Sequence, residues 1–239
     1  MGLLAKHSDI LTSKHTKNEE NNVLTWDNFD NNAFYEIIKA DGLKKFAERR
    51  GLAAGCDIEL LKPIWSKASS ILEIGAGYGR VINALLSKNY TGKISAIERC
   101  ASMMDALIKT YSNKINLFKN DLHNLGDIDE KFDVILWLWS GIGDFSKEEQ
   151  PIIVKHLKKL LQENGTLIID TIAMDIMPLE VIQHDRQLYT INVNEYVKYI
   201  YEPNTAEIKQ YAKEAGFKNF ECTSYQTDSS YERLLYILS

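Results

Sequence analysis

The sequence predicts a doubly wound α/β fold: a seven-stranded, mostly parallel sheet with an antiparallel last strand, preceded by an N-terminal helical segment. Three observations support this class. From Ser69 onward, apolar runs of strand length alternate with amphipathic segments of helix length. The apolar runs are almost continuous, as expected for strands covered on both faces of a parallel sheet. The first run leads directly into a glycine-rich loop, the place where open α/β sheets bind nucleotide-like ligands.

Composition narrows the classes of protein further. The chain has 239 residues, of which 45% are apolar, enough for one domain with an attached segment. The formal net charge is −5 and basic residues are interspersed with acidic ones, which disfavours nucleic acid as a partner. No apolar stretch approaches the roughly 20 residues of a membrane span, and the first apolar run is too short for a secretory signal. Together with three cysteines at no metal-binding spacing, this predicts a cytoplasmic protein outside membranes.

The front of the chain divides into two parts. Residues 1–22 end in a polar stretch without helical or strand periodicity, so we expect a mobile arm. Residues 23–68 are amphipathic and helical, and they need a surface to pack against, so we expect a lid or substrate segment. Its first helical stretch is interrupted near Gly42, and Pro63 ends or kinks its second stretch.

The domain expected over residues 69–239 follows from local patterns. A tyrosine-rich insertion at about 172–203 contains two extended stretches, and the short link between the last two strands favours an antiparallel pair. The expected elements are strand 70–75, helix 79–89, strand 93–98, helix 100–111, strand 115–121, strand 131–139, helix 146–165, strand 166–171, extended segments 187–192 and 195–203, helix 204–217, and strands 218–226 and 231–239.

The glycine-rich loop indicates the kind of ligand. Gly75, Gly77 and Gly79 follow the first strand with the spacing G-x-G-x-G, whereas the dinucleotide fingerprint is G-x-G-x-x-G/A. Arg80 occupies the position where that fingerprint has its last glycine. Glu73, two residues before the first glycine, would repel a pyrophosphate and attract an ammonium or sulfonium group. The loop therefore disfavours a nicotinamide-dependent oxidoreductase.

The stretch LEIGAGYGR resembles the E/D-x-G-x-G-x-G motif of class I S-adenosylmethionine-dependent methyltransferases. The resemblance implies that the loop backbone contacts the cofactor and that Glu73 binds its amino-acid end. Glu98, which ends the second strand 23 residues after Gly75, would then accept hydrogen bonds from both ribose hydroxyls.

Three later elements agree with this family and extend the resemblance over roughly residues 69–239. NDLHNL is similar to the family's D-x-x-x-L segment, which implies that Asp121 accepts from the adenine amino group. FDVILWLWSGIGDF is similar to the segment along the methionine part of the cofactor, and Met103 matches a position that packs on adenine. The implied cofactor-binding set is Glu73, Gly75, Ala76, Gly77, Gly79, Glu98, Arg99, Met103, Asp121, Leu122, Leu138 and Trp139.

Catalysis and the acceptor are less constrained. Methyl transfer from a sulfonium is an in-line displacement that depends mainly on alignment and exclusion of water, so no catalytic dyad is required. His123, Asp144 and His184 are the candidates for a catalytic role. The fourth strand ends in WSGIGDF and lacks the D/N-P-P-Y/F motif of amino-methylating nucleic-acid enzymes. Asp144 and Asp170 lie near suitable strand ends, but no Asp-Asp-Asn metal set is evident, and we expect no metal.

The front segment and the insertion are the expected walls of the acceptor site. A tyrosine-rich layer beneath a helical lid suits a small, partly apolar acceptor that is methylated at oxygen or nitrogen. Two alternatives stay open: a protein or rRNA methyltransferase of the same fold, and a non-catalytic protein that binds S-adenosylmethionine. The candidate substrate-binding residues are Trp26, Tyr35, Trp139, His184, Arg186 and Tyr199.

Overall fold

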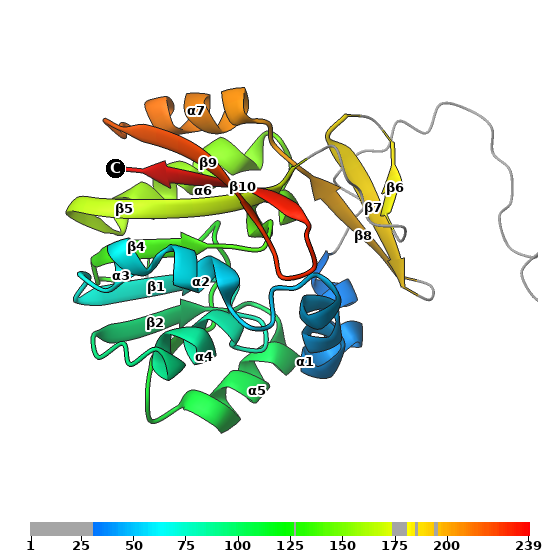
Figure 1. Cartoon of the computed structure of the whole chain (residues 1–239), viewed down its shortest axis with the longest axis horizontal. Helices are drawn as coiled ribbons and strands as arrows, with labels where there is room; N and C mark the ends of the chain where they lie inside the picture. The colour runs from blue at the N-terminus through cyan, green and yellow to red at the C-terminus, as the bar shows by residue number, and fades with distance from the viewer. Residues whose placement is uncertain (1–30, 127, 174–180, 185, 194–195) are drawn as a thin grey trace, which may run out of the picture.

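The computed structural model describes residues 31–126, 128–173, 181–184, 186–193 and 196–239 (Figure 1). The expected arm over residues 1–22 and the candidate Trp26 lie outside this part of the chain. No helix among the described residues is long and apolar enough to span a membrane.

A seven-stranded sheet forms the centre of the molecule, in the order β3-β2-β1-β4-β5-β10-β9 (Figure 1). Strands β1 to β5 are mutually parallel, and β10 runs antiparallel to both of its neighbours, which confirms the predicted fold class. Its strands are β1 (Ser70–Ile74), β2 (Lys93–Ile97), β3 (Asn116–Phe118), β4 (Phe132–Trp137), β5 (Leu161–Ile172), β9 (Phe220–Gln226) and β10 (Glu232–Leu238).

Helices cover both faces of this sheet, because alternate residues of each strand enter two separate cores. One core contains Leu72 and Trp137 with residues of α6 and α7, and the other contains Ile71 and Val134 with residues of α2 to α5. The helices are α1 (Asn31–Arg49), α2 (Cys56–Leu60), α3 (Lys62–Trp65), α4 (Arg80–Ser87), α5 (Ala101–Tyr111), α6 (Glu149–Lys159) and α7 (Thr205–Glu214), with the 3-10 turn η2 (Gly141–Asp144).

The break in α1 lies at Lys39, not near Gly42 as the sequence suggested. Lys39 has φ 55° and ψ 178°, outside the helical region. The helix is divided between two sets of contacts. Before the break, Asn31 and Tyr35 bond to β8 and η2; after it, Leu43 packs against the glycine-rich loop. Tertiary contacts thus set the position of the break. Gly42 stays within the helix, next to the Ile38 side chain.

Helix α6 also ends earlier than the sequence pattern indicated. It stops at Lys159, and residues 161–165 belong to β5. Leu161 pairs with Phe132 across a register shift in the β4–β5 ladder. Gly165 lies so close to this strand that a Cβ there would come within 2.9 Å of the Phe132 carbonyl oxygen. Gly165 therefore allows the two strands to approach closely, and it does not terminate the helix.

The insertion forms a second, antiparallel sheet of three strands beyond the carboxyl end of the main sheet (Figure 1). It comprises β6 (Val181–Gln183), β7 (Leu188–Val193) and β8 (Tyr196–Tyr201). The chain returns to the main sheet through α7, whose start is fixed by a capping box: the side chain of Asn204 accepts from the Glu207 N–H, and the Glu207 carboxylate accepts from the Asn204 N–H.

Candidate functional site

The glycine-rich loop joins β1 to α4 with three glycines in the left-handed region. Their φ angles are 65° at Gly75, 56° at Gly77 and 84° at Gly79, conformations that glycine adopts without steric cost. A Cβ on Gly77 would come within 2.8 Å of Leu43, and one on Gly79 within 2.5 Å of Tyr111. A Cβ on Gly75 would meet nothing within 4 Å. Gly77 and Gly79 thus allow close packing, and Gly75 faces open space.

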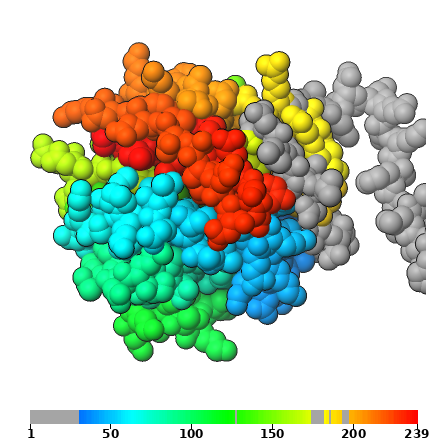
Figure 2. Space-filling model, in the orientation of Figure 1, coloured from blue at the N-terminus to red at the C-terminus, as the bar shows by residue number. Residues whose placement is uncertain are grey.

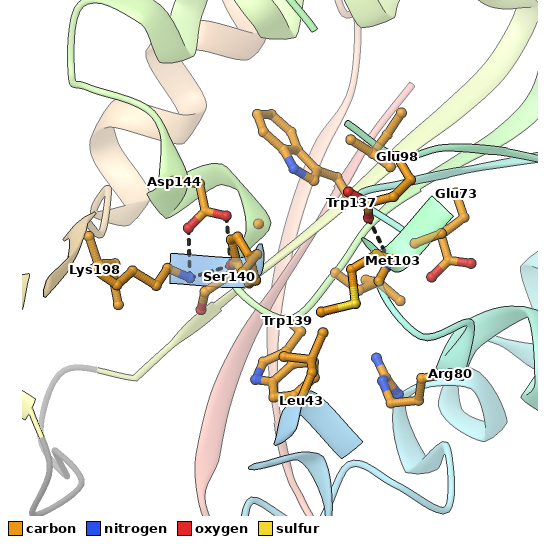
Figure 3. Close-up of a pocket in the computed structure, with 18 of the residues that line it drawn as sticks. Leu43, Glu73, Arg80, Glu98, Met103, Trp137, Trp139, Ser140, Asp144 and Lys198 are labelled. Carbon is orange, nitrogen blue, oxygen red and sulfur yellow. Dashed lines mark hydrogen bonds and ion pairs between the residues drawn. The ribbon is translucent and has the colours of Figure 1, made fainter. Parts of the chain in front are cut away.

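This open space belongs to a cavity over the carboxyl ends of β1, β2 and β4. The close-up shows Glu73 and Arg80 on one side, Asp144 and Lys198 on the opposite side, and Met103 between them (Figure 3). The cavity wall contains residues of the glycine loop, α1, α5, η2, the second sheet and β10. Predicted cofactor residues in that wall are Glu73, Gly75, Ala76, Gly77, Glu98, Arg99, Met103, Leu122, Leu138 and Trp139.

Glu98 is the carboxylate at the end of the second strand. Its Oε2 accepts from the Gly77 N–H at 2.7 Å, and its Oε1 accepts from the Cys100 N–H at 2.8 Å. Burial raises the pKa of Glu98, although these two N–H groups favour the ionised form. Each carboxylate oxygen can accept further hydrogen bonds, so the fixed carboxylate could receive a pair of adjacent hydroxyls.

Glu73 lies within β1 and is 5% exposed. Its Oε2 has no hydrogen-bond partner among the described residues. Burial raises the pKa of Glu73 to about 8, even though the nearby Arg80 charge works in the opposite direction. A buried carboxylate without a full set of partners is costly unless a ligand supplies the missing donor or charge. The site therefore fits a ligand with an ammonium group beside the glycine loop.

Arg80 has a partner that the sequence did not reveal. Its guanidinium forms a bidentate ion pair with the Asp57 carboxylate, and it also donates to the Leu52 carbonyl at 3.1 Å. Both charged side chains are at most 5% exposed. The arginine that departs from the dinucleotide pattern thus joins the start of α4 to α2.

The loop after β3 is arranged differently from the expectation for Asp121. The Asp121 carboxylate pairs with Arg99 at 3.3 Å and with His123 Nδ1 at 2.5 Å, and it does not line the cavity. His123 also reaches Glu149, at 2.9 Å, on the outer side of the fold. Asn120 and Leu122 line the cavity instead. Asn120 was missed because the family resemblance assigned the polar contact to the next residue.

A strained turn follows β4. Trp139 and Ser140 have φ angles of 58° and 55°, which non-glycine residues rarely adopt in succession. Trp137, two residues earlier, is 1% exposed and belongs to a hydrophobic core; it also contributes to the cavity wall with Trp139. The turn is held by the Ser140 N–H, which donates to Asp170 at 3.0 Å. Such strain persists only where surrounding contacts fix the backbone, and it is common at functional sites.

Tyr35, Asp144 and Lys198 form a partly buried triad in the cavity wall. Figure 3 shows Asp144 and Lys198 on the side of the cavity opposite Glu73. The Tyr35 hydroxyl donates to Asp144 Oδ2 at 2.8 Å, and Lys198 Nζ lies 2.5 Å from the Tyr35 oxygen and 2.6 Å from Asp144 Oδ1. Burial opposes the charge on Lys198, but the Asp144 carboxylate outweighs it and raises the pKa of the lysine. The triad joins α1, η2 and β8 with no net charge.

A second polar network surrounds the turn at Ser140. The Ser140 hydroxyl donates to Glu202 Oε1 at 2.8 Å and accepts from Arg233 at 2.9 Å. Arg233 Nε donates to Asp170 Oδ2 at 2.7 Å, and the Tyr225 hydroxyl donates to the same oxygen at 2.6 Å. Sequence analysis noted Asp170 only as a possible metal ligand, and it missed Lys198, Glu202 and Arg233. No group of three or more His, Cys, Asp or Glu side chains suited to a metal occurs in the described ranges.

Three of the candidate acceptor residues lie away from the cavity wall. His184 is exposed and bonds to the Thr190 hydroxyl at 2.9 Å, and Arg186 is exposed, with its carbonyl accepting from Tyr189. Tyr199 is buried, and its backbone pairs with the Asn31 side chain through two hydrogen bonds. Tyr189 and Lys198 line the cavity from the second sheet instead. Strand alternation decides the difference between Tyr199 and Lys198, whereas His184 and Arg186 lie between β6 and β7.

Comparisons with known proteins agree with this arrangement. Residues 71–165 match the family model described as a methyltransferase domain. A comparison with curated proteins finds no match.

Solved structures share the fold. The CcbJ methyltransferase from Streptomyces caelestis has a TM-score of 0.68 at 15% identity, with 87% of this chain and 98% of that chain covered. A 1,6-didemethyltoxoflavin-N1-methyltransferase from Burkholderia thailandensis has a TM-score of 0.65 at 14% identity, with 87% and 85% covered. CalS10, an amino pentose methyltransferase from Micromonospora echinaspora, has a TM-score of 0.62 at 11% identity, with 82% and 96% covered.

Proposed function

We propose that this chain, whose residues 71–165 match a methyltransferase domain, is a class I S-adenosylmethionine-dependent methyltransferase and that it methylates an oxygen or nitrogen atom of a small-molecule acceptor. The observation that carries the proposal is the far wall of the cavity. Side chains of α1, η2 and the second sheet cover the side opposite the glycine loop, and among them are Tyr35, Tyr189, Ile191, Lys198 and Ile200. An acceptor that fits between these walls is small.

The front of the molecule reinforces this wall. The Glu36 carboxylate accepts from the N–H groups of Ala101 and Ser102 at the start of α5, at 2.6 and 3.2 Å. At the other end of α1, Gly51 accepts from the Asp228 N–H in the link between β9 and β10. Figure 2 shows α1 packed beside this link on the molecular surface. These contacts support a lid role for α1, which belongs to the predicted lid segment of residues 23–68.

We assign the cofactor contacts to this chain's own groups as follows. Glu73 binds the ammonium group, Glu98 accepts from the ribose hydroxyls, and Met103 and Leu122 pack beside the adenine. The bound cofactor supplies an activated methyl group on a sulfonium. The protein orients the acceptor atom toward that methyl carbon and excludes water, an effect worth up to about 7 to 11 kcal/mol when the geometry is right.

The acceptors named for two of the similar methyltransferases support a small acceptor here. One is named a 1,6-didemethyltoxoflavin-N1-methyltransferase, and another is named for an amino pentose. The formal net charge of −5 gives independent support, because it disfavours an rRNA substrate.

Labelled methyl transfer tests the proposal. The protein is incubated with S-adenosylmethionine carrying a labelled methyl group and, separately, with the metabolite, protein and RNA fractions of a lysate from the source organism. We expect label in the metabolite fraction. Label confined to protein or RNA would support the macromolecular alternative. Binding of S-adenosylhomocysteine without transfer to any fraction would support a non-catalytic cofactor-binding role.

A further inference from the structure

Glu202 is a buried carboxylate at the acceptor end of the cavity. It directly follows β8, is 2% exposed and lines the cavity. Its Oε1 accepts from the Ile172 N–H at 2.7 Å and from the Ser140 hydroxyl at 2.8 Å. Ile172 ends β5, and Ser140 belongs to the turn that follows β4, where the main sheet meets the cavity. The carboxylate is therefore fixed in the cavity wall near the carboxyl ends of the strands, where open α/β sheets bind their ligands.

The charges around Glu202 leave it without an ionic partner of its own. Lys198 is paired with Asp144 at 2.6 Å, and Arg233 is paired with Asp170 at 2.7 Å. Among the described residues that line this end of the cavity, each of these two cations thus already has a carboxylate partner. Glu202 adds one further negative charge in a place shielded from water. A buried charge of this kind is costly unless a ligand compensates it.

The proton affinity of Glu202 reflects this imbalance. Burial raises the pKa of Glu202 to about 7, although the Arg233 charge and the two hydrogen bonds to Oε1 favour the ionised form, and Asp170 adds to the increase. Arg233 on β10 and Asp170 on β5 face it, and Tyr236 on β10 is coupled to it electrostatically. The Asp144–Lys198 pair lies on η2 and β8, against the same cavity. A carboxylate in this environment can take up and release a proton near neutral pH.

We propose that the acceptor is an amine and that Glu202 binds its ammonium form and removes the proton that blocks methylation. This inference rests on the proposed function. The ammonium group transfers one proton to the Glu202 carboxylate, which leaves a neutral amine with a free electron pair. That pair forms the bond to the methyl carbon while the carbon–sulfur bond breaks and its electrons stay on sulfur. The methylated amine carries the positive charge, and Glu202 returns its proton to solvent when the product leaves.

Other acceptor chemistries fit this end of the cavity less well. A carboxylate or phosphate on the acceptor would be repelled by Glu202. A neutral alcohol would leave the carboxylate charge uncompensated. The competing cation is the sulfonium of the methyl donor, and this alternative has a distinct consequence: Glu202 would then favour S-adenosylmethionine over S-adenosylhomocysteine, which lacks that charge.

The first experiment identifies the class of product. Labelled metabolites from the transfer assay are passed over a cation exchanger at pH 4 and eluted at pH 11. The inference expects label to be retained at pH 4 and released at pH 11, as for a methylated amine. Label that passes through at pH 4, as an ether or ester would, overturns the amine inference but leaves the proposed function intact. Absence of transfer to any metabolite overturns the proposed function itself.

The second experiment tests the residue, with Glu202→Gln compared with Glu73→Gln. The inference expects Glu202→Gln to bind S-adenosylhomocysteine and S-adenosylmethionine within about twofold of the wild type in calorimetry. It expects kcat/KM for the purified labelled acceptor to fall by about 100-fold or more, with loss of the limb of the pH profile near pH 7. Glu73→Gln should instead bind both S-adenosylhomocysteine and S-adenosylmethionine more weakly than the wild type.

Two results would overturn the role of Glu202. A selective loss of S-adenosylmethionine affinity in Glu202→Gln would assign its charge to the sulfonium. An unchanged kcat/KM and pH profile would make it a structural residue of the Ser140 network. Glu202→Asp keeps the charge on a shorter side chain, and it should partly recover the limb of the pH profile. This recovery would separate the loss of the base from a folding defect. Thermal unfolding of each variant checks for such a defect.

Discussion

The Arg80 guanidinium donates to both oxygens of the Asp57 carboxylate, with Nη1–Oδ1 and Nη2–Oδ2 distances of 2.7 and 2.6 Å. The pair is buried and spans two elements, since Arg80 begins α4 directly after the glycine loop and Asp57 lies in α2. Arg80 also lies 6.0 Å from the centre of the Trp139 ring. A change at Asp57 should therefore affect the cofactor loop as well as the stability of the fold.

We expect Asp57→Ala to lower the free energy of unfolding by about 3 to 5 kcal/mol, because it leaves a buried guanidinium without its partner. Urea denaturation measures this change. Glu59→Gln is the control: it removes a surface partner of Lys88, and water screens that pair, so the denaturation midpoint should not move. A stability of Asp57→Ala equal to that of the control would show that the buried pair contributes little.

The sequence predicted the site best where local pattern and position in the chain determine function. Glu73 lies in β1, just before the glycine-rich loop, and Glu98 directly follows β2. The structure places both side chains in the cavity wall. Arg80 was recognised as unusual, but its partner Asp57 lies 23 residues earlier in a different element. No local pattern specifies such a pairing, because it depends on how α2 packs against the sheet.

The acceptor end was harder to predict for a physical reason. Lys198 and Ile200 reach the cavity because of the pairing register of the second sheet, and a shift by one residue would turn each side chain to the other face. The sequence indicated an extended segment there but did not fix its register. His184 and Arg186 were chosen for their chemistry, and both are exposed. Likewise, tertiary contacts moved the break of α1 to Lys39.

Glu98 provides a direct test of the ribose contact. We expect Glu98→Ala to abolish the increase in melting temperature that S-adenosylhomocysteine gives the wild-type protein, because the acceptor of two hydroxyl hydrogen bonds is lost. NAD serves as the ligand control and should give no increase with either protein. The melting temperature of the free variant must also be recorded, since Glu98 accepts from the Gly77 and Cys100 N–H groups. Full retention of the shift would show that the ribose lies elsewhere.

Glu73 should make cofactor binding depend on pH. Its pKa of about 8 means that the free protein holds a proton there at pH 7, whereas an ammonium ligand requires the carboxylate. Binding of S-adenosylhomocysteine should therefore release a proton and strengthen as pH rises from 6 to 8. Calorimetry in two buffers of different ionisation enthalpy measures the released proton. Glu73→Gln should bind more weakly and release none at this position; an unchanged proton count would contradict the assignment.

Glu73 should also make the stability of the ligand-free protein fall as pH rises, whereas cofactor binding strengthens with pH. The pKa of Glu73 is raised above its unfolded value of 4.5, so the folded protein binds the proton more tightly than the unfolded chain does. Its contribution to stability is present below about pH 4.5 and is lost as pH rises toward 8. Without ligand, Glu73→Gln should lose less stability than the wild type between pH 5 and pH 8. Parallel unfolding curves for the two proteins would contradict this prediction.

The Tyr35–Asp144–Lys198 triad allows the lid and the acceptor wall to be tested together. Lys198→Met should lower the free energy of unfolding, since it leaves the partly buried Asp144 carboxylate beside a phenol but without its cation. The double variant Asp144→Asn with Lys198→Met removes both charges and should regain much of that loss. Tyr35→Phe retains the ion pair and should cost only about 0.5 to 1.5 kcal/mol, the usual contribution of one hydrogen bond.

The functional outcome separates a lid contact from a cofactor contact. Asp144 and Lys198 lie across the cavity from Glu73 (Figure 3), and Tyr35 contacts both, so Tyr35→Phe should leave the affinity for S-adenosylhomocysteine unchanged. It should raise KM for the acceptor, because the Tyr35 hydroxyl helps to hold Lys198 in the acceptor wall. Burial and the Asp144 charge raise the pKa of the Tyr35 phenol, so it stays protonated and does not act as a base. The variant should therefore keep the wild-type pH profile of kcat, and a lost limb would instead make Tyr35 a proton-transfer group.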